Sequence, residues 1–86
     1  MSITEPRFYR EYSVVMAESQ GNYIPCMPSI GSLTPITRIS AGSRFKFIRK
    51  VEEGLYEIEM IGNGEVKSMI TSHVFEWLLP VYRKKR

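Results

Sequence analysis

The residues that could perform acid, base or nucleophilic chemistry are few in this chain. The single histidine, His73, and the single cysteine, Cys26, stand 47 positions apart, too far for a local metal-ligand motif. His73 has no nucleophile partner at a recognisable spacing, and no basic residue adjoins Cys26 to activate its thiol. We therefore expect no catalytic residue, no metal and no cofactor, and a protein that is not an enzyme.

Two glutamates deserve comparison with a catalytic pair. Glu57 and Glu59 lie two positions apart, which places both carboxylates on one face of a strand. Lys46 and Lys67 are available to pair with them. The sequence therefore favours structural ion pairs over acid/base catalysis.

The basic residues suggest a phosphate-binding role. The chain carries a net charge of +3, but four of its twelve basic residues close the sequence, leaving eight basic against nine acidic residues before them. Four adjacent cations can neutralise phosphates and release counterions, whereas the alternative is a solubilising terminus. These candidate nucleic-acid-binding residues are Arg83, Lys84, Lys85 and Arg86.

A second basic group follows one predicted strand, where it alternates with Phe45 and Phe47. Basic and aromatic residues together can bind single-stranded nucleic acid through phosphate contacts and base stacking. The alternative is a surface neutralised by glutamates of the adjoining strand. The candidates in this group are Arg44, Lys46, Arg49 and Lys50.

Three tyrosines near the N-terminus are candidates for protein recognition. Tyr9, Tyr12 and Tyr23 would form an aromatic patch if they were exposed on one surface. The alternative is that they fill the core, because a small barrel needs aromatic volume.

The central element that must position these residues is a three-stranded meander over residues 44–70. Apolar and charged residues alternate in its first two strands, with a turn at residues 52–54 between them. The apolar faces coincide in a single register, which pairs Phe45 with Met60, Phe47 with Ile58 and Lys46 with Glu59, and sets Ile48 beside Glu57.

The second turn, at residues 62–64, leaves two registers open. A two-residue loop would set Lys67 opposite Met60 on the apolar face. A three-residue loop, with Gly64 left-handed, sets Val66 opposite Met60 and buries no lysine. We predict the second register, with Lys67 opposite Glu59.

Shorter elements are predicted on both sides of the meander. Residues 8–17 alternate as a strand, and residues 23–27 return as a short edge strand that completes an N-terminal hairpin. A loop follows over residues 28–35, with another brief strand at 36–39.

The spacing of the apolar residues near the C-terminus, over residues 74–79, is compatible with both a helix and a strand. Val74, Trp77 and Leu78 fit a helical stripe, whereas Phe75, Trp77 and Leu79 fit a strand. We predict a short helical turn near residues 72–77, of the 3₁₀ type, and then a strand that ends at Pro80, with Phe75 and Trp77 in the core.

This order of elements resembles the small SH3-like barrel. The segments that carry the resemblance are GSRFKFIRK, GLYEIEMIGNGEV and WLLPV, between about Gly42 and Val81. The resemblance implies an all-β fold, a small SH3-like barrel or roll of about five to six short antiparallel strands. Such folds host nucleic-acid-binding, peptide-binding and enzymatic proteins, so the fold selects none of these functions.

The chain is expected to form one domain over residues 8–82, with a flexible arm at 1–7 and a basic tail at 83–86. With 86 residues and no apolar run long enough to cross a bilayer, we expect a cytoplasmic protein with no membrane partner. The leading hypothesis is a small nucleic-acid-binding or regulatory module for DNA or RNA. The alternative is an interaction module, inhibitor or adaptor, of the kind that mobile elements encode, for a larger protein. A homodimer is left open, and an enzyme assembled between subunits ranks last.

Overall fold

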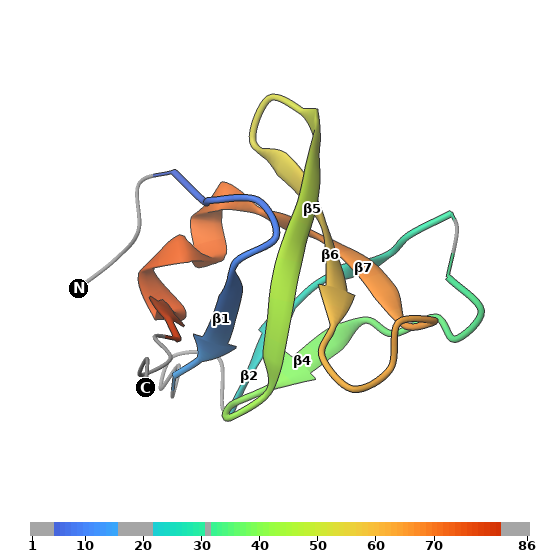
Figure 1. Ribbon diagram of the computed structural model, residues 1–86, viewed down its shortest axis with the longest axis horizontal. Helices are drawn as coiled ribbons and strands as arrows, with labels where there is room; N and C mark the ends of the chain where they lie inside the picture. Colours follow the sequence, from blue (N-terminus) through green and yellow to red (C-terminus); the bar gives the residue numbers. More distant parts are fainter. Residues whose placement is uncertain (1–4, 16–21, 31, 82–86) are drawn as a thin grey trace, which may run out of the picture.

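The computed structural model describes residues 5–15, 22–30 and 32–81, which form eight strands and one 3₁₀ helix. The elements are β1 (Glu11–Val14), β2 (Tyr23–Pro25), β3 (Met27–Pro28), β4 (Arg38–Ser40), β5 (Arg44–Glu52), β6 (Leu55–Met60), β7 (Lys67–Thr71), η1 (Ser72–Trp77) and β8 (Leu78–Pro80). Six strands form one antiparallel sheet in the order β3-β7-β6-β5-β1-β8, and β2 pairs with β4 in a second sheet (Figure 1). The all-β fold with its short helical turn is as predicted, although the strands outnumber the five to six expected.

The meander has the predicted register over its first half. Phe45 lies opposite Met60, Phe47 opposite Ile58, and Lys46 opposite Glu59. Beyond Phe47 the register shifts at a bulge, so Arg49 lies opposite Glu57. The predicted position of Ile48 beside Glu57 is therefore wrong by one residue.

The second turn has the predicted strand pairing, but a different glycine is left-handed. Lys67 lies opposite Glu59, and the Met60 N–H donates to the Val66 carbonyl over 3.0 Å. The left-handed residue is Gly62, with φ of 92°, and not Gly64. A side chain at Gly62 would be strained by this φ, so the turn depends on the missing Cβ there.

The prediction that β1 and β2 form an N-terminal hairpin is wrong, because the two strands do not pair with each other. β1 is shorter than expected and pairs with β5 and β8, whereas β2 pairs with β4. The partners of β1 thus come from far along the chain, and β1 lies in the sheet between the meander and the last strand. Figure 1 shows β1 lying along β5, with β2 and β4 together at one end.

The core is built around the aromatic ring of Phe47, which is fully buried. Four aromatic rings meet it at centroid distances of 5.1 to 5.9 Å, three of them from Tyr12, Tyr56 and Phe75. These edge-to-face contacts are the favoured geometry for aromatic pairs. Phe75 is buried as predicted, and Trp77 packs against the core at its margin.

The segment between β3 and β4 is fastened along one edge of the sheet. Met27 lies opposite Met69 in the β3–β7 pair, and Ser32 accepts the Lys67 N–H over 3.1 Å. The Leu33 N–H donates to the Glu65 carbonyl over 3.2 Å. These contacts bring Ser29 over the outer face of β6, where it meets Glu57.

Candidate functional site

Each cation of the predicted basic strand has a carboxylate partner. The ion pairs are Arg44–Glu11 at 3.3 Å, Lys46–Glu59 at 3.8 Å, Arg49–Glu57 at 2.8 Å and Lys50–Glu53 at 3.0 Å. Of these, only the pairing of Lys46 with Glu59 follows from the sequence register. β5 therefore presents a largely neutralised row of charges and not a free row of cations.

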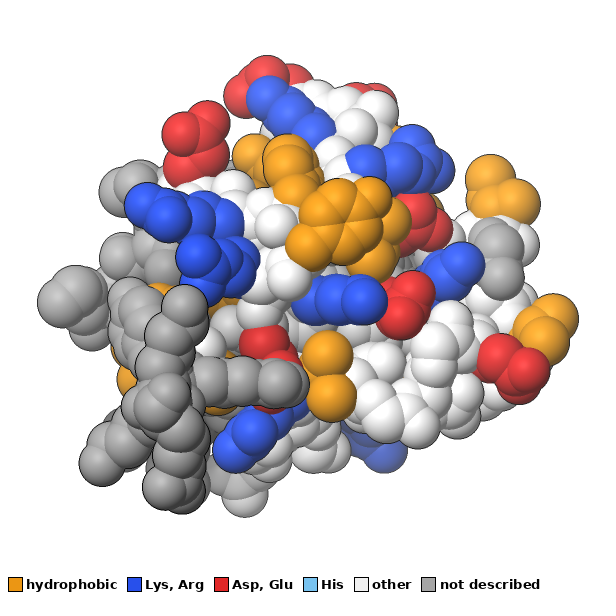
Figure 2. All heavy atoms as spheres, viewed as in Figure 1, with side chains coloured by type: hydrophobic (Ala, Val, Ile, Leu, Met, Phe, Trp, Pro, Cys, Tyr) orange, Lys and Arg blue, Asp and Glu red, His pale blue; other side chains and the backbone are white. Residues whose placement is uncertain are grey.

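The charges of the outer face alternate across the strands. Glu11 lies opposite Lys46, Lys46 opposite Glu59, and Glu59 opposite Lys67. Opposite charges at facing positions stabilise a sheet, whereas a row of cations alone would repel. Figure 2 likewise shows basic and acidic side chains interspersed over the visible face, with hydrophobic side chains at its centre.

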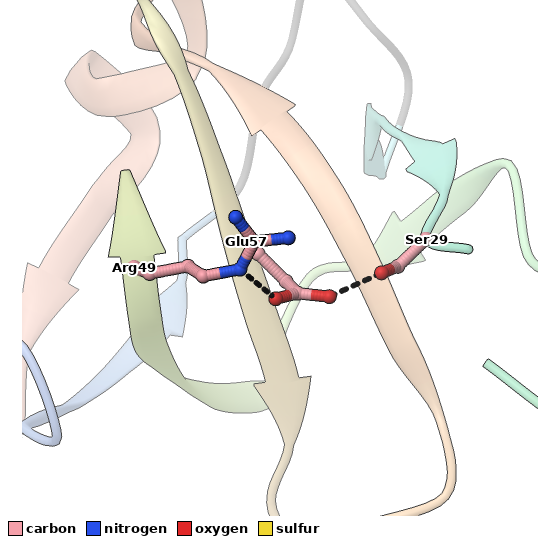
Figure 3. Close-up of polar contacts among 3 residues, drawn as sticks. All are labelled: Ser29, Arg49 and Glu57. Atoms are coloured by element: carbon pink, nitrogen blue, oxygen red, sulfur yellow. Dashed lines mark hydrogen bonds and ion pairs between the residues drawn. The ribbon is translucent and has the colours of Figure 1, made fainter. Parts of the chain in front are cut away.

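Glu57 is the buried one among the glutamates that pair with the β5 cations, and two donors hold its carboxylate (Figure 3). The Arg49 Nε donates to Oε1, and the Ser29 hydroxyl donates to Oε2. Burial by itself raises the pKa of Glu57, but the hydrogen bonds from Ser29 and Arg49 and the nearby charges of Arg49 and Lys67 outweigh it. The pKa is lowered overall, which makes Glu57 a poor proton acceptor and supports a structural role.

Replacing Glu57 with glutamine is expected to reduce the free energy of unfolding at neutral pH by about 1–2 kcal/mol. The lower part of the range for charged hydrogen bonds applies because the Arg49 side chain is 61% exposed. Since the folded-state pKa of Glu57 lies below the ordinary value of 4.5, its contribution is present above pH 4.5 and is lost as the pH falls through the folded pKa. Urea unfolding across this acidic range measures both effects, and the variant should lose less stability on acidification.

Glu53→Gln is the matched control for this substitution. Glu53 also pairs with a cation, but its side chain is 94% exposed, so we expect no measurable change in unfolding. Equal losses in the two variants would contradict a special role for the buried carboxylate.

The three candidate tyrosines occupy three different environments. Tyr12 is buried in the core, so a surface role for Tyr12 is excluded. Tyr23 lies on β2 and is 37% exposed, with the Arg38 guanidinium 5.1 Å from its ring centre. Tyr9 is 71% exposed and precedes β1. The three tyrosines therefore do not form one exposed patch: the core alternative holds for Tyr12, and Tyr9 is the most exposed of the three.

Tyr9 belongs to a tight turn formed by residues 7–10, the 7–10 turn. The Arg10 N–H donates to the Arg7 carbonyl over 3.4 Å, which closes the turn. Tyr9 has φ of 65°, and among the described residues no other non-glycine residue has a positive φ. Glycine or asparagine normally fills the third position of such a turn, so an aromatic residue there is strained.

Two hydrogen bonds fasten the 7–10 turn to the sheet. The Tyr9 N–H donates to the Phe47 carbonyl over 2.7 Å, and the Arg7 N–H donates to the Tyr12 hydroxyl over 3.0 Å. Phe8 forms an isolated bridge with Phe47 and remains 44% exposed. These bonds anchor the turn to the sheet, while the side chains of Phe8 and Tyr9 remain exposed.

Sequence reasoning missed three members of this turn. Arg7, Phe8 and Arg10 flank Tyr9, but the alternation from residue 8 indicated a strand and hid the turn. A signal was present in the order Arg-Phe-Tyr-Arg directly after Pro6, which combines residue types common at protein interfaces. The left-handed backbone at Tyr9 had no sequence signal.

Cys26 and His73, the remaining candidates among the described residues, do not form a common site. Cys26 is half-buried and its thiol donates to the Ile36 carbonyl, and burial raises the thiol pKa, which disfavours a reactive thiolate. His73 is exposed in η1. The candidate cations Arg83, Lys84, Lys85 and Arg86 lie outside the described residues.

The described part of the chain holds neither a cluster of metal ligands nor a membrane-spanning helix. No group of three or more histidine, cysteine or acidic side chains in residues 5–15, 22–30 and 32–81 could hold a metal ion. Within the same residues, no helix has the length and apolar character to cross a membrane. Comparisons of the chain with protein-family models, with curated proteins and with solved structures found no match.

Proposed function

We propose that the protein is a non-enzymatic interaction module that binds a larger protein through the 7–10 turn. The observation that carries this proposal is the combination of a strained backbone with an exposed aromatic side chain at Tyr9. Residues held in unfavourable backbone conformations persist where the surrounding structure enforces them, and they cluster at functional sites.

The composition of the turn also fits protein recognition. Tyrosine and arginine are enriched among the residues that dominate binding energy at protein interfaces. Phe8 adds exposed apolar area between the two arginines. Because hydrogen bonds already order the turn, a partner pays little conformational entropy to bind it.

Nucleic-acid binding by the β5 surface has less support. Its four candidate cations are engaged by carboxylates, and binding phosphate there would require exchanging these pairs. The tail residues 83–86 keep the second candidate function open because their charge is concentrated and has the composition of a phosphate-binding terminus.

Affinity capture with the full chain tests the proposal. The double variant Phe8→Ser/Tyr9→Ser should lose a nuclease-resistant protein partner, and the partner should bind the wild-type chain again after purification. The matched control, Ile30→Ser/Leu33→Ser, removes two exposed apolar side chains elsewhere and should retain the partner.

The opposite pattern would overturn the proposal. Capture that disappears after nuclease treatment, falls steeply with salt and is lost when residues 83–86 are removed would establish the nucleic-acid role instead. Equal loss in both double variants would show nonspecific hydrophobic adsorption.

A further inference from the structure

An open pocket of about 310 Å³ adjoins the 7–10 turn. Arg7 and Arg10 line it from the turn, Glu5 and Glu11 add acidic groups, and Tyr12, Pro80 and Val81 complete its lining. The pocket therefore combines charged side chains with the apolar side chains of Pro80 and Val81.

The two arginines differ from the cations of β5. Among the described residues, neither guanidinium group forms an ion pair or a hydrogen bond, although all four candidate cations on β5 are paired. The turn hydrogen bond between Arg10 and Arg7 brings the two residues together at the pocket. Both guanidinium groups are thus available to an outside acceptor, and planar guanidinium matches a carboxylate in bidentate geometry.

The charges that line the pocket favour a ligand with a single negative charge. Two arginines face two glutamates, but Glu11 is also paired with Arg44 at 3.3 Å. Arg44 lies outside the lining, and with Glu11 engaged by it the other charged lining groups, Arg7, Arg10 and Glu5, carry one net positive charge. A single carboxylate matches this balance, whereas a phosphodiester strand or a dianionic phosphate brings more negative charge close to Glu5 and Glu11.

We propose that this pocket binds the carboxylate of an acidic side chain from the partner protein, with a neighbouring apolar side chain against Pro80 and Val81. This inference rests on the proposed function, since the carboxylate would belong to the segment that contacts the 7–10 turn. Arg7 and Arg10 hold the carboxylate, while Phe8 and Tyr9 contact the surrounding partner surface. The site therefore adds a chemical requirement to the partner: an acidic residue next to an apolar one.

A peptide titration tests the pocket without the partner. The probes are acetyl-Leu-Glu-Leu-amide and its neutral isostere acetyl-Leu-Gln-Leu-amide, added to the ¹⁵N-labelled full chain and followed by NMR. The glutamate peptide should bind saturably, shift the resonances of Arg7, Arg10 and Val81, and bind about tenfold more tightly than the glutamine peptide.

Variants assign this binding to the two arginines. Arg7→Gln and Arg10→Gln should each weaken the glutamate peptide about fivefold while leaving the remaining spectrum unchanged. Arg38→Gln removes an arginine that lies outside the pocket and should leave binding unchanged.

Three results would overturn the inference. Equal affinity for both peptides would show that the carboxylate is not recognised, and shifts confined to other residues would place binding elsewhere. Tighter binding of inorganic phosphate or of oligothymidylate at Arg7 and Arg10 would assign the pocket to phosphate. If the peptide fails but capture still depends on Phe8 and Tyr9, only the carboxylate assignment is wrong; loss of that dependence refutes the proposed function itself.

Discussion

Replacing Phe47 with alanine is expected to lower the free energy of unfolding by about 3–5 kcal/mol. The Phe47 ring is fully buried and packs edge to face against four other aromatic rings. Its removal deletes these contacts and leaves a cavity, and a small domain has only about 5–15 kcal/mol of total stability. The variant should therefore be partly unfolded even without denaturant if the wild type lies at the low end of this range.

Urea unfolding followed by the fluorescence of Trp77 measures this loss. Trp77 is the only tryptophan of the chain and packs against the core, so its emission reports on core integrity. Phe8→Ala is the matched control, because Phe8 is 44% exposed and bridges to the same residue. Similar losses in the two variants would contradict the position of Phe47 at the centre of the core.

Replacing Tyr9 with glycine is expected to increase stability and weaken partner binding at the same time. Glycine adopts positive φ without steric strain, which should add about 0.5–1 kcal/mol to the free energy of unfolding after the entropy of the unfolded chain is subtracted. The same change removes the exposed aromatic ring, and loss of such an anchor typically costs about 2 kcal/mol of binding, or roughly 30-fold in affinity.

Tyr23→Gly gives the opposite signature and serves as the control. Tyr23 lies within β2 with no positive φ, so glycine there should reduce stability, by about 0.5–1 kcal/mol. Its affinity for a partner that docks on the 7–10 turn should stay unchanged. A Tyr9→Gly variant that is less stable than the wild type would contradict the inferred strain, and unchanged affinity would contradict the role in recognition.

The meander was accessible to sequence reasoning because its signals are local. Alternation placed Phe45, Phe47 and Ile58 on one face, and this face is the core. A one-residue slip would have exposed all of them, so the register followed from the pattern. The bulge after Phe47 had no such signal, because the pattern does not distinguish whether Ile48 or Arg49 lies opposite Glu57. Turn chemistry likewise indicated a positive φ without identifying Gly62.

The N-terminal pairing could not be predicted in the same way. Alternation assigned Tyr12 and Val14 to a common face, and both are buried. The pattern sets the face of a strand but does not choose its partner. Proximity along the chain favoured a hairpin with residues 23–27, whereas β1 inserts between β5 and β8.

The candidate site depends still more on contacts between distant residues. The Lys46–Glu59 pair could be inferred from a hairpin register, but Glu11–Arg44 and Ser29–Glu57 join residues 33 and 28 positions apart. A left-handed tyrosine is contrary to local backbone preference, so no propensity argument would place one at Tyr9. Such conflicts between local preference and the folded structure are expected at functional sites.

Photo-crosslinking from position 9 tests the central claim most directly. The full chain with benzoylphenylalanine in place of Tyr9 would be irradiated in an extract of its source cells, with a second chain labelled in place of Leu33 as the control, since Leu33 is also strongly exposed. We expect a defined protein adduct from position 9 that resists nuclease and is absent from position 33. Adducts only with nucleic acid, or the same protein adducts from both positions, would contradict recognition of a protein partner by the 7–10 turn.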